Sequence, residues 1–153
     1  MTNAIRTMAI TLILAGFVVA AQAQTGKPIT IVDANTVTAA ELAKLPHMNA
    51  DLAKAVIAKR PFKTVKDLDT ALSSLKKEQR TELYGKLFVP INLNTATDEE
   101  ILLIPGVGNR MLHEFEEYRP YESLAKFHRE IAKYVNDTEL ARLEQYVSVP
   151  QQK

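Results

Sequence analysis

The chain repeats itself, and this repeat is the feature that most restricts how it can fold. A shift of 59 residues aligns residues 32–68 with residues 91–127 without a gap. Asn35-Thr36 then falls on Asn94-Thr95, and Arg60-Pro61 falls on Arg119-Pro120. A repeat of this length predicts two similar supersecondary units in tandem, not one long helical array.

Apolar residues within each repeat recur at helical spacing. Leu42 and Leu45 are three residues apart, and Leu52 and Val56 are four apart. This spacing predicts helices that each bury one stripe. Two Thr-x-x-Glu segments, residues 38–41 and 97–100, have the pattern of a capping box, which marks a helix start.

Four short helices are expected in each unit, so the predicted fold class is all-α. The first helices should end at Pro46 and Pro105, because the residue before a proline disfavours the helical region. The second should run to about Lys59 and Tyr118, and the third should begin after the N-caps Thr64 and Ser123. The fourth should begin at about Lys76 and at Asn136 or Asp137, and short extended arms are expected at 29–32 and 90–93.

Residues 1–23 have the layout of a secretory signal peptide. Arg6 precedes an apolar stretch from Met8 to about Ala21, and Ala21-Gln22-Ala23 offers a cleavage site before Gln24. An uncleaved anchor is the alternative, but the stretch is shorter than the roughly 20 residues that a spanning helix needs. We therefore expect a periplasmic or secreted protein with no membrane span after cleavage.

The near-neutral charge of the chain hides an uneven distribution. The 153 residues include 19 basic and 18 acidic ones, and no Cys, which excludes disulfides, cysteine-ligated zinc and thiol catalysis. Residues 27–90 hold 11 basic and 7 acidic residues, 11 − 7 = +4, whereas residues 91–153 hold 7 and 11, 7 − 11 = −4. The two units thus carry opposite charges.

One motif has chemical potential: Ile104-Pro105-Gly106-Val107-Gly108, between two predicted helices. Glycine adopts positive φ and allows close backbone approach, so Gly-x-Gly favours a tight hairpin. The unpaired N–H groups at the next helix start, together with the helix dipole, favour an anion such as a phosphate. Asn109 and Arg110 follow directly and could add side-chain donors.

Residues 92–108, followed by Tyr118-Arg119, resemble the helix-hairpin-helix domain of ComEA-type DNA-uptake proteins. Residues 60–68 resemble the segment after that domain's first hairpin. The resemblance implies two tandem helix-hairpin-helix units, 24–90 and 91–153, in which hairpin amides grip the backbone of double-stranded DNA without reading sequence. It assigns the phosphate contacts to Gly106, Val107 and Gly108, with Arg110 beside them.

The chain departs from this family pattern in three of its four hairpin positions. Unit one has Pro46-His47-Met48-Asn49 where unit two has Gly-x-Gly, and the later hairpins, near 73–76 and 134–137, contain no glycine. The Gly-x-Gly also lies in the acidic unit, followed by Glu114, Glu116 and Glu117, whereas DNA affinity rests on Lys and Arg. Five residues of unit one form a possible secondary basic surface, or simply a solvated face: Lys54, Lys59, Arg60, Lys63 and Lys66.

No catalytic, metal or cofactor pattern is evident. His47, His113 and His128 lack the spacing of a shared metal site, and the aromatic residues of unit two are expected to pack its core: Tyr118, Tyr121, Phe127, Tyr134 and Tyr146. Two hypotheses follow for a non-enzymatic protein. The first is sequence-independent binding of double-stranded DNA, as in DNA uptake. The alternative is a scaffold that binds a protein partner or self-associates through its oppositely charged units.

Overall fold

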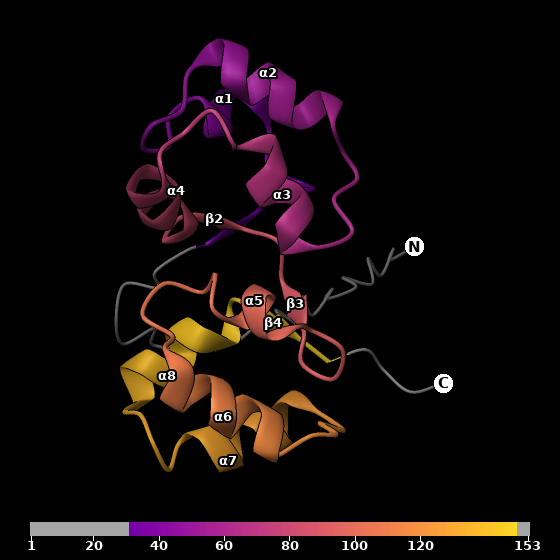
Figure 1. Cartoon of the computed structure of the whole chain (residues 1–153), viewed down its shortest axis with the longest axis vertical. Helices are drawn as coiled ribbons and strands as arrows, with labels where there is room; N and C mark the ends of the chain where they lie inside the picture. Colours follow the sequence, from indigo (N-terminus) through magenta and orange to yellow (C-terminus); the bar gives the residue numbers. More distant parts are fainter. Residues whose placement is uncertain (1–30, 150–153) are drawn as a thin grey trace, which may run out of the picture.

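The computed structural model describes residues 31–149 and shows a mostly helical chain with eight short helices in that range (Figure 1). This confirms the predicted all-α fold class with short helices and hairpin turns. The predicted signal peptide, residues 1–23, lies outside the described residues. We call residues 31–90 the first half and residues 91–149 the second half.

Each half contains four helices between two strands of two residues. The elements of the first half are β1 (Val32–Asp33), α1 (Ala39–Leu42), α2 (Ala50–Ala58), α3 (Val65–Ala71), α4 (Lys77–Tyr84) and β2 (Leu87–Phe88). Those of the second half are β3 (Ile91–Asn92), α5 (Asp98–Ile101), α6 (Asn109–Glu117), α7 (Leu124–Ile131), α8 (Asp137–Glu144) and β4 (Val147–Ser148). The order of elements is therefore the same in both halves.

The helix starts follow the capping residues that the sequence predicts. Thr38 accepts from the amide of Glu41, while the Glu41 carboxylate accepts from the amide of Thr38. Thr97 and Glu100 form the same capping box. Thr64 and Ser123 cap α3 and α7, which confirms both predicted N-caps. Each cap satisfies amides that the first turn of a helix leaves unpaired.

The first helices are shorter than predicted. They end at Leu42 and Ile101, before Pro46 and Pro105, and the chain continues in tighter turns. Lys44 donates to the carbonyl of Glu41, and Leu45 donates to that of Leu42, three residues earlier in each case. Such bonds close the end of a helix as 3₁₀ turns, so proline influences the chain after regular α-helix has already stopped.

Parallel strand pairs join the two ends of each half. β1 pairs with β2, with Val32 opposite Leu87, and β3 pairs with β4, with Ile91 opposite Val147. The extended arms were predicted near β1 and β3, but β2 and β4 were missed. A strand of two residues is too short to show an alternating pattern, and its partner is set by tertiary packing.

The two halves share one apolar core. In Figure 1 they are stacked along the long axis, with β2 and β3 in the region where they meet. The Phe88 ring packs edge-on against Tyr146, with ring centroids 4.8 Å apart. The Tyr146 hydroxyl donates to the carbonyl of Tyr84 over 3.1 Å. Aromatic burial of this kind stabilises the contact between the halves.

The aromatic residues of the second half behave largely as expected. Tyr121, Phe127 and Tyr146 are fully buried. Tyr118 and Tyr134 are half-buried, and their hydroxyl groups lie 2.8 Å apart. Within residues 31–149 no helix is long and apolar enough to cross a membrane.

Candidate nucleic-acid interface

The Gly-x-Gly hairpin lies on the surface between α5 and α6. Gly106 has φ 82°, in the left-handed region that favours glycine, and Gly106 and Gly108 are both exposed. A Cβ added at Gly108 would meet nothing within 4 Å. The hairpin backbone is therefore open to close approach by a ligand.

The start of α6 leaves backbone donors free. Gly108 is the N-cap residue and has no side chain that could accept from the first turn. Within the described part of the chain, no oxygen accepts from the amides of Asn109, Arg110 or Met111; the first bonded amide is that of Leu112, which donates to Gly108. Three N–H groups at the positive end of a nine-residue helix favour an anion.

Val107 does not present its amide as the family resemblance implies. Its N–H donates to the carbonyl of Ile104 over 3.0 Å, and this bond closes the hairpin turn. The residue is half-buried among apolar neighbours. The donors available to a ligand are thus those around Val107, at Gly106 and at the start of α6.

The hairpin between α1 and α2 has the same backbone shape with different chemistry. His47 occupies the position of Gly106 and also has positive φ, 62°, and Met48 closes the turn by donating to Leu45. Asn49 occupies the position of Gly108, and its Oδ1 accepts from the amide of Leu52 over 2.8 Å. The amide of Leu52 corresponds to that of Met111, which is free at the start of α6. At the start of α2 this donor is therefore already bonded within the chain.

Acidic residues lie beside the hairpin of the basic first half, and arginines lie beside the hairpin of the acidic second half. Asp51 lies in the first turn of α2, whereas Arg110 occupies the same position of α6. Glu82 on α4 contacts His47, with Nε2 and Oε2 2.7 Å apart. Arg142 occupies the equivalent position of α8, and its Nη2 lies 3.4 Å from where a Cβ of Gly106 would be. The Gly-x-Gly hairpin therefore has arginines beside it, one of which, Arg142, is paired with Glu139.

Arg142 is a candidate site residue that sequence reasoning missed. It is held by Glu139, which accepts from Nε over 2.7 Å and from Nη2 over 2.6 Å, and it lies over the Tyr146 ring. The hydrogen bonds to Glu139 raise the pKa of the guanidinium, so it stays charged. The available signal was the shift of 60 residues that aligns Arg142 with Glu82, but only the fold brings Arg142 to Gly106.

The carboxylates that follow the hairpin oppose an anion less than their number indicates. Glu114 is only 8% exposed and points away from solvent. Glu116 pairs with Arg119 over 3.4 Å, and Glu117 lies 3.8 Å from His113. The exposed Glu116 and Glu117 lie about 10–12 Å along the axis from the first residue of α6, where salt weakens their effect.

The predicted basic surface of the first half divides into free and engaged side chains. Lys54, Lys59 and Lys63 are exposed, and among residues 31–149 no carboxylate lies within 4.0 Å of their ammonium groups. Lys66 lies 3.9 Å from Glu99 of the second half. Arg60 is engaged in the fold, since its Nη2 donates to the carbonyl of Val37 over 2.7 Å. We therefore leave Arg60 out of this surface.

The remaining hairpins are less open. Asn136 caps α8 by accepting from the amide of Glu139, and the Lys76 amide at the start of α4 donates to Gln79. Of the five consecutive residues of the sequence-predicted site, Gly106, Gly108, Asn109 and Arg110 are exposed and Val107 is half-buried. In the described residues, no group of three or more His, Cys, Asp or Glu side chains is placed to hold a metal ion.

A family model described as helix-hairpin-helix motif matches residues 27–83, which covers the first half up to α4. The match thus falls on the half that carries His47 and Asn49 and does not include the Gly-x-Gly hairpin. No curated protein and no solved structure matches the chain.

Proposed function

We propose that this protein binds double-stranded DNA without reading its sequence and catalyses no reaction. The helix-hairpin-helix motif of residues 27–83 is generally associated with non-specific DNA binding. The phosphate-binding element that we assign is the hairpin from Gly106 to Arg110. The finer parts of the proposal are that the second half is a second helix-hairpin-helix unit, that the protein is exported, and that it acts in DNA uptake.

The observation that carries the proposal is the uncapped start of α6, which follows Gly106 and Gly108, contains Arg110 and has Arg142 near Gly106. Gly106 and Gly108 let a phosphate approach the backbone, and the amides of Asn109, Arg110 and Met111 supply donors. Hydrogen bonds to a charged group contribute about 1.5–3 kcal/mol each. Arg110 and Arg142 add the positive charge that displaces counterions from DNA.

The second half supports its assignment as a helix-hairpin-helix unit by repeating the contacts of the first. Asn35 bonds to the backbone N–H and carbonyl of Phe62 over 2.8 and 3.0 Å. Asn94 bonds in the same way to Tyr121 over 2.6 and 2.8 Å. Both asparagines hold the strand arm against the segment that follows the second helix of their half.

A duplex titration at several salt concentrations tests DNA binding. A labelled blunt duplex of mixed sequence, followed by fluorescence anisotropy, should bind, and the slope of log K against log salt should be about −2 for contacts by Arg110 and Arg142 alone. A second duplex of unrelated sequence should bind equally well. Absence of binding at low salt contradicts the proposal, and a strong preference for one duplex contradicts sequence independence.

Export is tested separately, by N-terminal sequencing of the protein recovered from expressing cells. A chain that begins at Gln24 in the extracytoplasmic fraction supports the proposal. A chain that keeps residues 1–23 in the cytoplasm contradicts it.

A scaffold that self-associates is a second candidate, because the opposite charges of the halves already meet within one molecule. The Nζ of Lys66 in the first half lies 3.9 Å from the Oε2 of Glu99 in the second half. The same attraction between two molecules would give head-to-tail contacts that weaken with salt. Sedimentation velocity at low and high salt should then show an oligomer that dissociates, and a monomer throughout contradicts this candidate.

A further inference from the structure

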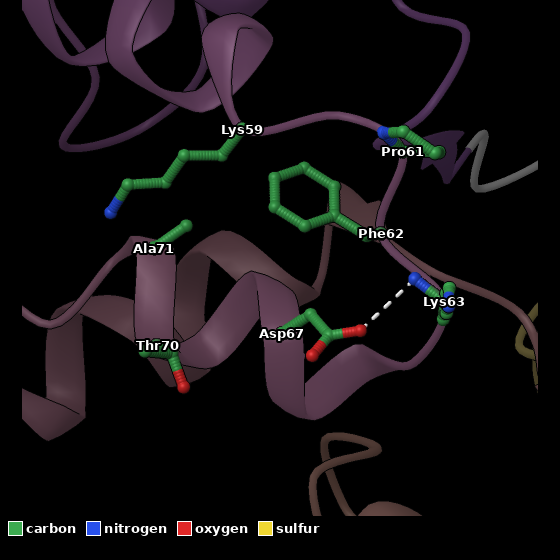
Figure 2. A pocket seen from close by; sticks show the side chains of 7 residues that line it. All are labelled: Lys59, Pro61, Phe62, Lys63, Asp67, Thr70 and Ala71. Carbon is green, nitrogen blue, oxygen red and sulfur yellow. Dashed lines mark hydrogen bonds between the residues drawn. The ribbon is translucent and has the colours of Figure 1, made fainter.

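A groove in the first half is not used by the hairpin. It has a volume of about 450 Å³ and lies between the end of α2 and α3 (Figure 2). Seven residues line it: Lys59, Pro61, Phe62, Lys63, Asp67, Thr70 and Ala71. This volume falls within the range of roughly 300–1,000 Å³ of small-molecule sites.

The groove combines an apolar floor with positive charge at its rim. Figure 2 shows the Phe62 ring between the side chain of Lys59 and that of Asp67, with Ala71 close to the Lys59 stem. Lys59 and Lys63 are exposed, and among the described residues neither forms an ion pair. An anion with an attached apolar ring would satisfy both parts of the groove.

Two polar groups of the groove keep acceptor capacity. Asp67 Oδ2 accepts from the amides of Lys63 and Thr64 over 3.0 and 2.9 Å, which leaves Oδ1 for another donor. The Thr70 hydroxyl donates to the carbonyl of Lys66 over 2.9 Å, so its oxygen can still accept. The exocyclic amino group of a nucleobase is a donor that fits such acceptors.

The equivalent positions of the second half hold different side chains. Glu130 replaces Ala71, is largely buried, and pairs with Arg129 and Lys133. Those hydrogen bonds, first from Lys133 and then from Arg129, hold the pKa of Glu130 below its usual range. Lys126 replaces Asp67 and donates to the carbonyl of Pro120 over 2.7 Å. The first half thus has the small, uncharged Ala71 where the second half has a charged and paired Glu130.

We propose that this groove binds a single unpaired nucleotide, with its base on the floor formed by Phe62 and Ala71, beside the Lys59 side chain, and its phosphate at Lys63. The choice of a nucleotide over another ring-bearing anion rests on the proposed DNA-binding function. In DNA, the ligand is an unstacked nucleotide at a strand end. The hairpin of the second half is not needed for this binding.

Titration of the isotope-labelled protein with deoxyadenosine monophosphate, followed by amide NMR shifts, tests the groove directly. The largest shifts are expected at residues 59–71, and deoxyadenosine alone or inorganic phosphate alone should bind more weakly. Ala71→Glu, which copies Glu130, should abolish these shifts. Lys63→Glu, which copies Glu122, should weaken binding by at least about fivefold, the effect of one ion pair at 4 Å in water.

Lys77→Glu on α4 is the matched control, since it changes the same charge outside the groove. Equal weakening by Lys77→Glu and Lys63→Glu overturns the inference, as do wild-type shifts that lie outside residues 59–71. Far-UV circular dichroism verifies that each variant folds. If Ala71→Glu does not fold, the result for Lys63→Glu still tests the inference.

Duplex binding separates this inference from the proposed function. Nucleotide shifts in the groove without any duplex affinity support the groove and contradict the proposed function. Duplex affinity without nucleotide shifts in the groove supports the proposed function and contradicts the inference about the groove. A duplex with a short single-stranded overhang should bind wild type more tightly than a blunt duplex, and Ala71→Glu should remove this gain while keeping blunt-duplex binding.

Discussion

The hairpin between α1 and α2 and the hairpin between α5 and α6 have the same backbone shape. They differ in almost every group that a phosphate would contact. Both turn through a residue with positive φ, His47 or Gly106, and both are followed by a nine-residue helix. The first is capped by Asn49 and flanked by acidic residues, whereas the second is uncapped and flanked by Arg110 and Arg142. A hairpin can thus keep its structural role and lose the features that favour an anion.

This comparison also changes the meaning of net charge. Residues 27–90 carry +4 and residues 91–153 carry −4. Nevertheless, Asp51 and Glu82 lie at the hairpin of the basic half. Arg110 and Arg142, the latter paired with Glu139, lie at the hairpin of the acidic half. A sum over 60 residues averages groups that lie beyond the roughly 10 Å reach of a charge in salt solution. The charges within reach of the ligand are the ones that affect its binding.

The largest expected effect concerns the buried core within each half. Phe115→Ala should cost about 3–5 kcal/mol of unfolding free energy, because it empties a fully buried site. Val56→Ala, at the equivalent site of the first half, should cost about 2 kcal/mol. Thermal denaturation should show one transition for either variant, since Phe88 packs on Tyr146 across the halves. Two separate transitions would mean that the halves unfold independently.

A smaller effect is expected from removing one charge beside each hairpin. Arg142→Gln should weaken duplex binding for every sequence and make the salt slope shallower by about 1, as for the loss of one phosphate contact. Glu82→Gln should leave the slope unchanged, because the hairpin of His47 is not the anchor. Salt-series anisotropy measures both. Equal changes in the two variants would remove the distinction between the hairpins.

The smallest effect on stability is expected from exchanging the N-cap residues. Gly108→Asn should raise the unfolding free energy by a few tenths of a kcal/mol, since asparagine caps a helix slightly better than glycine. It should also lower duplex affinity, because the new side chain accepts from an amide at the start of α6. Asn49→Gly should lower stability equally and gain no affinity, since Asp51 and Glu82 remain. Chemical denaturation and anisotropy report the two quantities, and higher affinity for Gly108→Asn would contradict the role of the free amides.

Local sequence signals predicted most of the fold, because helix starts are set by adjacent residues. Thr38, Thr64, Thr97 and Ser123 all cap the helices that they were expected to cap. The strands β2 and β4 and the early ends of α1 and α5 were missed, since those features depend on tertiary packing and on the tightening of the last turn.

The site was predicted less completely, for the same physical reason. Gly106, Gly108 and Arg110 are adjacent in sequence, and the structure places all three at the surface. Arg142 reaches the hairpin only through the packing of α8, and the engagement of Arg60 with Val37 and of Val107 with Ile104 depends on contacts that no local pattern reports. Spacing predicted where the donors are, and the fold decides which of them are free.

The most direct test transplants the first hairpin into the second. The triple variant Gly106→His, Val107→Met and Gly108→Asn should keep its helix content, because these residues already form the same turn at positions 47–49. Its affinity for a blunt duplex at low salt should fall at least about tenfold, the loss of one hydrogen bond to a charged group. Unchanged affinity with intact helix content would show that the Gly-x-Gly hairpin is not where this protein holds DNA.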